Sequence, residues 1–284
     1  MTGPVSGADF GPDSGAAGTG EPLRPWAVVT GAARGMGAAV AARLARDGFD
    51  LLLLDRPDPD LAGAVGYPLG TGEDLDRTAE QCRSAGAVAV VARADVRDET
   101  AVVAAVARVP AGRLRAAVAV AGIIGVDKPA WEFTRDELAL DLDTNFHGVA
   151  NLARATVPRL LVAPAGTGRF VAVVSIAGEV GLPRLAAYVA SKHAALGYIR
   201  SLAADLGPHG VTANAILPGS TRTALLERSA QVYGLADIEQ FGSAQRLGRL
   251  IEPADIAAAA SWLCGPDSSA VTGTDFRVDG GFVG

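Results

Sequence analysis

The sequence predicts a single doubly wound α/β domain, with a parallel sheet of about seven strands flanked by helices. Three observations support this fold class. Short apolar runs alternate with longer segments of helical periodicity along the whole chain. The runs have no polar face, as expected of strands buried on both sides. No change of composition marks a second domain, and no internal repeat is present.

The first elements show the pattern clearly. WAVVTG (26–31) is an apolar run that ends at a glycine turn, and MGAAVAARLARDG (36–48) carries Val40 and Leu44 at helical spacing before a glycine. FDLLLLD (49–55) is too short for a helix. On the same grounds, further strands are expected at 87–95, 116–122, 169–175, 211–219 and 274–281. Further helices are expected at 73–85, 98–108, 134–163, 186–207 and 253–263.

Composition limits both the extent of the domain and its class. Residues 1–23 are rich in Gly, Ser, Pro and Asp and bury little apolar surface, so we expect a disordered extension before a domain spanning 24–284. A net charge of -6 and the absence of a basic patch argue against nucleic-acid binding. Without a signal-like start or an apolar run of about 18 residues, a cytoplasmic protein with no membrane partner is expected.

The cysteines predict neither a disulfide framework nor a metal site. Cys82 and Cys264 lie far apart, and no second Cys or His stands near either at metal-ligand spacing. We expect two buried free thiols.

A glycine-rich turn, TGAARGMG (30–37), joins the first strand to the first helix. Gly31 allows the tight turn, Gly35 lets the backbone approach a pyrophosphate, and Gly37 lets helix and strand pack closely. The helix N-terminus offers free N–H donors to the phosphates. The spacing is G-x-x-x-G-x-G rather than G-x-G-x-x-G, and in a chain with 35 glycines such a cluster alone also fits a structural turn.

Asp55 makes the nucleotide interpretation stronger. It ends the second strand, where a carboxylate can accept hydrogen bonds from both ribose hydroxyls of an adenosine. Its charge would repel a 2'-phosphate, so NAD is expected rather than NADP, although Arg56 next to it can soften that repulsion. A solvated turn residue before Pro57 is the alternative. Asp95 ends the next strand and can bind the adenine amino group.

Three residues predict the reaction. Ser175 ends a strand at the carboxyl edge of the sheet, and Tyr188 and Lys192 are spaced to share one helix face. A phenol has a pKa near 10, so it needs a nearby positive charge to act as a base at neutral pH. An ammonium group supplies such a charge, as would an oxidised nicotinamide. Tyr188 can then take the proton of an alcohol whose carbon gives up hydride, while Ser175 holds the same oxygen. The chain has only two lysines, and arginine could not replace Lys192 in a proton relay.

These residues resemble the short-chain dehydrogenase/reductase family from about residue 26 to residue 284. The motifs are TGAARGMG, NFHG (145–148), the serine, YVASK (188–192) and PGSTRT (218–223). The resemblance implies a Rossmann fold and a catalytic tetrad of Asn145, Ser175, Tyr188 and Lys192. In that scheme the Asn145 backbone holds a water that links Lys192 to solvent, and Lys192 also binds the nicotinamide ribose. Thr223 lies near the carboxamide.

The resemblance and the glycine turn together define a set of cofactor-binding residues. They are Gly31, Arg34, Gly35, Met36, Gly37, Asp55, Arg56, Asp95, Val96, Ala121, Gly122, Tyr188, Lys192, Pro218, Gly219, Thr221 and Thr223. One departure is the sequence VAG at 120–122, where the family usually reads N-A-G. Val120 lacks the polar side chain that braces the sheet there. This puts local stability in doubt more than chemistry, since the small Ala121–Gly122 pair is retained.

A narrower resemblance links the chain to the actinobacterial subgroup associated with the redox cofactor mycofactocin. It is carried by a long connection at 56–72 with YPLGTGEDL (67–75), and by GLPRLAAYVASKHA (181–194), TANAILPGSTRTALL (212–226) and VDGGF. It implies that the inserted loop covers NAD, which stays bound between turnovers while electrons leave to mycofactocin. The loop residues expected to stiffen it or to close over the adenosine half are Pro57, Pro59, Pro68, Val65, Tyr67 and Leu69. A plain surface insertion fits them too.

Segment 223–253 is expected to form a substrate lid. Its apolar residues predict a pocket for a hydrophobic or terpenoid-like secondary alcohol or ketone, or else they pack the lid onto the body. They are Leu225, Leu226, Val232, Tyr233, Leu235 and Phe241. His147 and His193 adjoin motifs and are interpreted as structural, because the tyrosine already supplies the acid/base group. Apolar helices and the C-terminal strand favour an oligomer, and the family implies a homotetramer.

The sequence therefore predicts an NAD-linked alcohol dehydrogenase or ketone reductase. Three alternatives remain open: a family member with freely exchanging NAD(H), a silent NAD-binding protein, and another Rossmann enzyme such as a methyltransferase. The intact Ser175, Tyr188 and Lys192 argue against the second, and the glycine pattern and the Y-x-x-x-K pair against the third.

Overall fold

The computed structural model describes residues 23–56 and 59–283. The extension predicted at 1–23 lies, except for Leu23, outside the described residues, as do Pro57 and Gly284. A seven-stranded sheet forms the centre of the molecule, in the order β3-β2-β1-β4-β5-β6-β7, and all its pairings are parallel. This confirms the predicted fold class.

The bounds of the elements follow the predicted alternation of strand and helix. The strands are β1 (Trp26–Thr30), β2 (Asp50–Asp55), β3 (Ala89–Arg93), β4 (Leu114–Ala119), β5 (Arg169–Val173), β6 (Thr212–Pro218) and β7 (Asp275–Val278). The helices are α1 (Gly35–Arg46), α2 (Pro59–Val65), α3 (Gly72–Ser84), α4 (Glu99–Val106), α5 (Arg135–Leu142), α6 (Gly148–Leu161), α7 (Ala186–Leu206), α8 (Ala224–Tyr233) and α9 (Pro253–Cys264).

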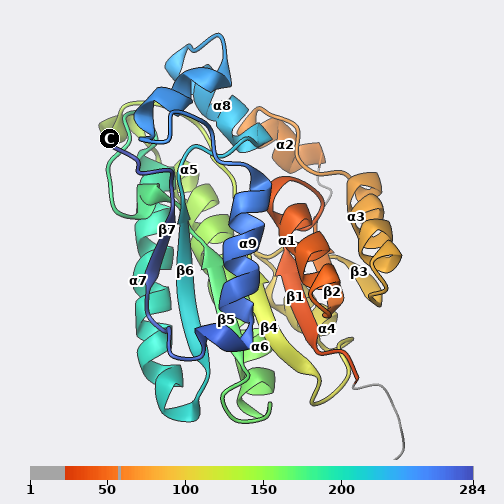
Figure 1. Ribbon diagram of the computed structural model, residues 1–284. Helices are drawn as coiled ribbons and strands as arrows, with labels where there is room; N and C mark the ends of the chain where they lie inside the picture. The colour runs from red at the N-terminus through yellow and green to blue at the C-terminus, as the bar shows by residue number, and fades with distance from the viewer. Residues whose placement is uncertain (1–22, 57–58, 284) are drawn as a thin grey trace, which may run out of the picture.

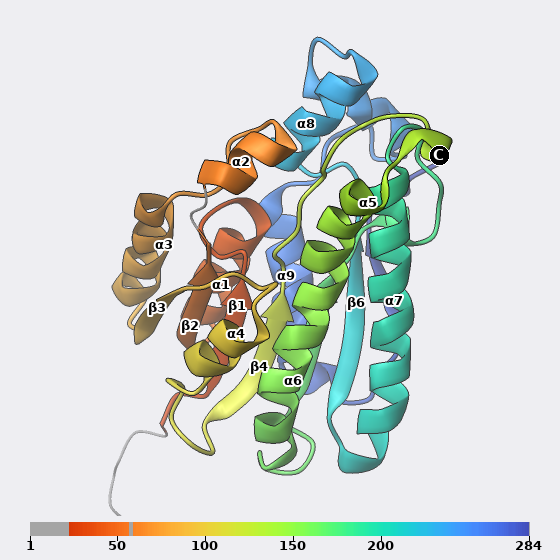
Figure 2. The same ribbon diagram turned by 180° about the vertical axis from the view of Figure 1, so that it is seen from behind.

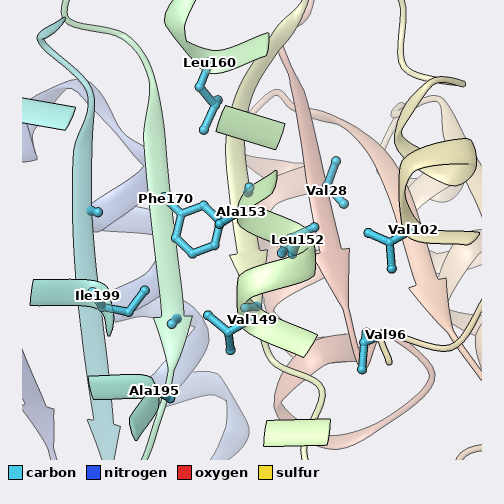
Figure 3. Packing of buried hydrophobic residues seen from close by; sticks show 14 of the residues in the cluster. Val28, Val96, Val102, Val149, Leu152, Ala153, Leu160, Phe170, Ala195 and Ile199 are labelled. Atoms are coloured by element: carbon cyan, nitrogen blue, oxygen red, sulfur yellow. The ribbon is translucent and has the colours of Figure 1, made fainter. Parts of the chain in front are cut away.

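Two helical layers enclose the sheet, as Figure 1 and Figure 2 show from opposite sides. Helices α4, α6 and α7 cover one face, and α1, α3 and α9 cover the other. Successive β1 residues point to opposite layers, since Val28 packs with the first core and Val29 with the second. Figure 3 shows Leu152 of α6 beside Phe170 of β5 in the first core. Burial on both faces explains why the strands are apolar throughout.

The sheet order creates the crevice where ligands bind in this class of fold. β1 pairs with β2 on one side and with β4 on the other, so the order reverses direction at β1. In open α/β sheets the binding crevice lies outside the carboxyl ends of the strands at this switch point. The turn after β1 and the segment after β4 therefore lie side by side.

Two predicted segments differ in the structure. The long connection at 56–72 contains helix α2, which has Pro59 at its first position and Gly66 in a left-handed conformation (φ +77°) after its end. These end signals are present in the sequence, but seven residues are too few to show helical periodicity. The helix predicted at 134–163 is two helices joined by a π-helical turn, Asp143–His147, whose wider winding changes the register of the side chains between them.

Both cysteines are buried free thiols, as predicted. Burial raises the pKa of Cys82 to about 11 and that of Cys264 to about 12, so both stay protonated and unreactive at neutral pH. Among the described residues, no helix is both long and apolar enough to cross a membrane.

Candidate active site

One cavity at the carboxyl edge of the sheet brings the predicted residues together. Every residue predicted to bind the cofactor lines it, and Ser175 does as well. Asn145 lies behind the cavity wall and is almost fully buried. His147 and His193 are exposed and do not line the cavity.

The glycine turn is shaped for close approach. Gly31 has φ +67°, and a Cβ there would lie 2.7 Å from the backbone nitrogen of Ala121. A Cβ on Gly37 would collide with the Gly31 carbonyl oxygen. Arg34, the N-cap of α1, makes no side-chain cap hydrogen bond, and the first turn holds no acidic residue. The N-terminus of α1 is therefore suited to an anion such as a pyrophosphate.

Asp55 is anchored in the cavity wall. Its two carboxylate oxygens accept the backbone N–H groups of Ala33 and Arg56, each at 2.8 Å. Burial raises the pKa of Asp55, while these two hydrogen bonds and the Arg34 charge oppose the rise. Because Asp55 lines the cavity and is held in place, the alternative of a solvated turn residue does not fit.

Asp95 is held by two arginines. It accepts hydrogen bonds from the Arg97 backbone N–H at 2.9 Å and from Arg97 Nε at 2.8 Å, and it forms an ion pair with Arg56. Burial acts to raise the pKa of Asp95, but these hydrogen bonds and charges hold it below its usual range. The carboxylate thus already has strong donors but also lines the cavity, and its role as an adenine acceptor stays a prediction. The same ion pair draws Arg56 toward Asp95.

The departure at Val120 is compensated from the neighbouring strand. Thr30, almost fully buried at the end of β1, accepts hydrogen bonds from the backbone N–H groups of Val120 and Ala121 at 3.1 and 3.2 Å. Val120 itself packs against the core on the α1 side. A hydroxyl on β1 therefore braces the end of β4, which ends at Ala119 and not at residue 122 as predicted.

The three predicted reactive groups meet in the cavity. Ser175 follows β5, and its Oγ accepts the Ala177 N–H at 3.0 Å. Tyr188 and Lys192 lie one turn apart on α7, both buried, with Lys192 Nζ 5.6 Å from the centre of the tyrosine ring. The spacing of the sequence thus places the serine hydroxyl, the phenol and the ammonium around one space.

Burial dominates the electrostatics of this group. It raises the pKa of Tyr188 to about 12, and a hydrogen bond with Ser175 opposes the rise. It also lowers the pKa of Lys192 to about 8, against the attraction of Asp141. The protein groups by themselves therefore do not produce the lowered Tyr188 pKa that the sequence analysis expected from Lys192.

Asn145 orients the backbone after β4. It lies in the π-helical turn, where its Oδ1 accepts the Ile123 N–H at 2.8 Å and its Nδ2 donates to the Ile123 carbonyl at 2.9 Å. Nδ2 also donates to Ser191 Oγ at 2.9 Å. With its side chain used in this way, only the backbone of Asn145 remains for the relay role that the family resemblance implies.

The inserted segment reaches over the middle of the cavity. Tyr67 is buried, and its hydroxyl accepts the Ile124 N–H at 3.1 Å. Arg34 donates to the Pro68 carbonyl. Val65 and Tyr67 pack with Ile123 and with Leu225 of α8. Figure 1 and Figure 2 both show α2 beside α8. The apolar side chains thus lie toward the segment after β4 rather than over Asp55.

The segment predicted as a lid has a mixed role. Leu225 and Leu226 line the cavity, whereas Tyr233 packs onto the body, with its hydroxyl donating to the Pro183 carbonyl at 3.1 Å and its ring 6.2 Å from that of Phe241. Some of these apolar residues therefore form the pocket wall, and others pack the segment onto the body of the domain. Further apolar lining residues, which the sequence analysis missed, are Ile123, Ile124, Leu182 and Leu185.

Asp141 is a buried charged residue that the sequence did not indicate. It is fully buried in α5, and burial raises its pKa to about 7, with the Gly125 N–H and Lys192 opposing. The sequence feature that could have indicated it is an aspartate inside the apolar run LALDL (138–142), one helical turn before Asn145.

Fold, cavity and reactive groups define an NAD-dependent oxidoreductase of the short-chain dehydrogenase/reductase family, to which the chain belongs. The family model that matches residues 31–283 is described as enoyl-(acyl carrier protein) reductase.

Individual relatives match over nearly their whole length. The chain is 34% identical to (-)-trans-carveol dehydrogenase of Rhodococcus erythropolis, covering 90% of this chain and 96% of that one. It is 37% identical to an A-factor type gamma-butyrolactone 1'-reductase (1S-forming) of Streptomyces virginiae, covering 90% and 95%. Among solved structures, carveol dehydrogenase from Mycobacterium avium in complex with NAD superposes with a TM-score of 0.84 at 30% identity, covering 93% and 99%.

Proposed function

We propose that this enzyme oxidises a hydrophobic, terpenoid-like secondary alcohol, or reduces the matching ketone, and keeps its NAD bound between turnovers for re-oxidation by mycofactocin. The observation that carries the proposal is the meeting of Ser175, Tyr188 and Lys192 in the same cavity as the glycine turn and Asp55. The open N-terminus of α1 and the anchored Asp55 carboxylate fit the pyrophosphate and adenosine ribose of NAD.

In the proposed mechanism, Ser175 Oγ binds the alcohol oxygen and Tyr188 Oη accepts its proton. NAD, when bound, supplies the hydride acceptor and, in its oxidised form, a positive charge. That charge adds to the Lys192 ammonium, and together they favour the phenolate against the burial that raises the Tyr188 pKa to about 12. Lys192 then passes the proton from Tyr188 to a water held by the Asn145 backbone, which links it to solvent. The Asn145 side chain keeps the segment at Ile123 in place.

The substrate class follows from the cavity wall. The side chains around Ser175 and Tyr188 include Ile124, Leu182 and Leu185, together with Leu225 from α8. Apolar walls of this kind favour a hydrocarbon skeleton that carries one hydroxyl or keto group. The two carveol dehydrogenases among the relatives and solved structures support a cyclic terpenoid alcohol.

Retention of NAD is supported by the contacts of the insert. Tyr67 bonds to Ile124, Pro68 bonds to Arg34, and the insert meets Leu225 of α8 over the cavity. Release of a dinucleotide from beneath this segment requires these contacts to open, which slows exchange. An enzyme that cannot exchange NADH needs an external electron acceptor, and we propose mycofactocin for this role.

Release of bound NAD tests the proposal. Purified protein, precipitated and extracted, is expected to yield near-stoichiometric NAD by mass spectrometry. With a terpenoid alcohol it should show little steady turnover on added NAD, and sustained ketone formation once an artificial acceptor is present. Loss of NAD on dialysis, together with fast turnover on added NAD, would leave the alternative of freely exchanging NAD(H).

We also propose that the enzyme is a cytoplasmic homotetramer. β7 forms one edge of the sheet, and Trp262 of α9, partly exposed, packs beside Phe276 of that strand at 5.7 Å between ring centroids. An exposed sheet edge with aromatic neighbours is suited to pairing with a second copy of the chain.

A further inference from the structure

Asp141 is a buried carboxyl group that the proposed mechanism does not use. Its Oδ1 accepts the Gly125 N–H at 3.3 Å, and its Oδ2 is buried without a hydrogen-bond partner among the described residues. A buried carboxyl with an unsatisfied oxygen destabilises a fold unless a nearby positive charge compensates. The positive charge that acts on Asp141 is the ammonium group of Lys192.

Asp141 and Lys192 approach opposite ends of one short segment, Gly122–Gly125, which follows β4. A Cβ on Gly122 would lie 3.3 Å from Lys192 Nζ, and a Cβ on Gly125 would collide with Asp141 Oδ2. Helix α5, which carries Asp141, packs along α7, which carries Lys192. The two packed helices thus bring both side chains against the same four-residue segment, where two glycines leave room for them.

Each of the two groups acts on the ionisation of the other. Burial lowers the pKa of Lys192 to about 8, and the charge of Asp141 opposes this. Burial raises the pKa of Asp141 to about 7, and the Gly125 N–H and the charge of Lys192 oppose this. Such groups titrate as a pair, so removing one charge changes the pKa of the other.

The other cations near this segment already have carboxylate partners. The buried hydroxyls of Tyr67 and Tyr188 also interact with the charge of Asp141. Arg228 reaches the Gly125 carbonyl at 3.4 Å but pairs with Asp127 at 2.7 Å, and Lys128 pairs with Glu137 at 2.6 Å. The cation whose charge acts on Asp141 is Lys192.

We propose that Asp141 is a positioning residue whose carboxylate provides the counter-charge that keeps the buried ammonium of Lys192 protonated in the neutral range. Through Lys192 it supports the ionisation of Tyr188. The catalytic consequence rests on the proposed function, whereas the pairing of the two charges does not.

The chain contains only two lysines, Lys128 and Lys192, so the ionisation of Lys192 can be measured directly. Protein labelled with ¹⁵N-lysine gives two side-chain Nζ signals in NMR, and Lys128→Arg assigns them. In the wild type the Lys192 signal is expected to titrate near its folded pKa of about 8. In Asp141→Asn, which keeps the size and an acceptor for Gly125, the midpoint should fall by about one pH unit or more. Asp141→Glu should restore most of the shift.

A neighbouring carboxyl supplies the matched control. Asp143 lies two residues along the chain with its side chain half exposed, so Asp143→Asn removes the same charge from the surface and should leave the Lys192 midpoint in place. An unchanged midpoint in folded Asp141→Asn would overturn the proposal. If asparagine at 141 prevents folding, Asp141→Leu removes the charge and the hydrogen-bonding requirement together and gives the same comparison.

This titration is independent of the proposed reaction, because it needs neither substrate nor NAD. Where alcohol oxidation is measurable, Asp141→Asn is expected to lower kcat with little change in KM, and Asp141→Glu to recover it. A merely structural role would change stability without moving the Lys192 midpoint.

Discussion

Tyr188 is the residue on which the proposed proton transfer depends. Tyr188→Phe keeps the buried ring and removes only the hydroxyl, so alcohol oxidation should fall by about 10²–10⁴-fold. Bound NAD should remain, because the glycine turn and Asp55 are untouched. Turnover with an artificial acceptor and mass spectrometry of the extracted cofactor measure the two effects. Tyr233→Phe is the control, since that hydroxyl bonds to Pro183; full activity in Tyr188→Phe would contradict the mechanism.

The limits of sequence reasoning are also clearest at single residues. Asp55 and Ser175 could be assigned because each ends an apolar run, and the ends of parallel strands all meet at one edge of the sheet. Asp141 could not, because its importance comes from the packing of α5 on α7 and from glycines distant in sequence. The bracing of Val120 by Thr30 is likewise a contact between strands that no motif records.

At the scale of elements, strands were more predictable than short helices. A short apolar run flanked by Gly or Pro is typical of a buried strand because it is too short for a buried helix, whereas α2 is too short to show periodicity. The π-helical turn could not be predicted from the sequence, because one extra residue in a helical turn leaves no signature in the amino-acid composition. Both missed features border the cavity, since α2 leads to Tyr67 and the turn holds Asn145.

The insert offers a prediction at the same scale. Tyr67→Phe removes the acceptor of the Ile124 N–H, and leaving a buried N–H unpaired costs about 1–3 kcal/mol. If the insert retains NAD, this change should speed NAD release by roughly tenfold or more. The rate can be followed as bound NAD lost after rapid dilution. Tyr198→Phe, on α7 outside the cavity, is the control; equal release rates in both variants would show that the insert does not retain NAD.

The whole molecule combines a sheet enclosed by two helical layers with a cavity that is also lined by the insert and by α8. The sheet edge and the helices behind it position the glycine turn, Ser175 and Tyr188, and further lining comes from the insert and α8, which meet at Leu225. The reactive groups lie at the ends of strands and on α7, whereas the apolar wall is assembled from several separate segments. This explains why the reaction class could be predicted from motifs, whereas the pocket wall required the structure.

The buried Asp141 should shape the pH dependence of global stability. Its pKa rises from an ordinary value of 3.8 to about 7 on folding. Above about pH 4 the unfolded chain releases this proton while the folded chain keeps it, so stability declines as the pH rises to about 7 and the full deficit persists above that pH. Asp141→Asn removes this pH-dependent deficit, although it also takes the counter-charge from Lys192.

The stability of Asp141→Asn relative to the wild type should therefore be greater at pH 8 than at pH 5. The difference in unfolding free energy should be on the order of a few kcal/mol, and the Tm should change in the same direction. Lys192 has the opposite pH dependence. Its folded pKa of about 8 lies below the ordinary 10.5, so its own deficit is present at low pH and disappears as the pH rises through about 8 to 10.5. Thermal melts at the two pH values measure the difference, with Asp143→Asn as the exposed control. A gain that is equal at both pH values would mean that Asp141 is already ionised in the folded protein at pH 5, and that its environment is more polar than its burial implies.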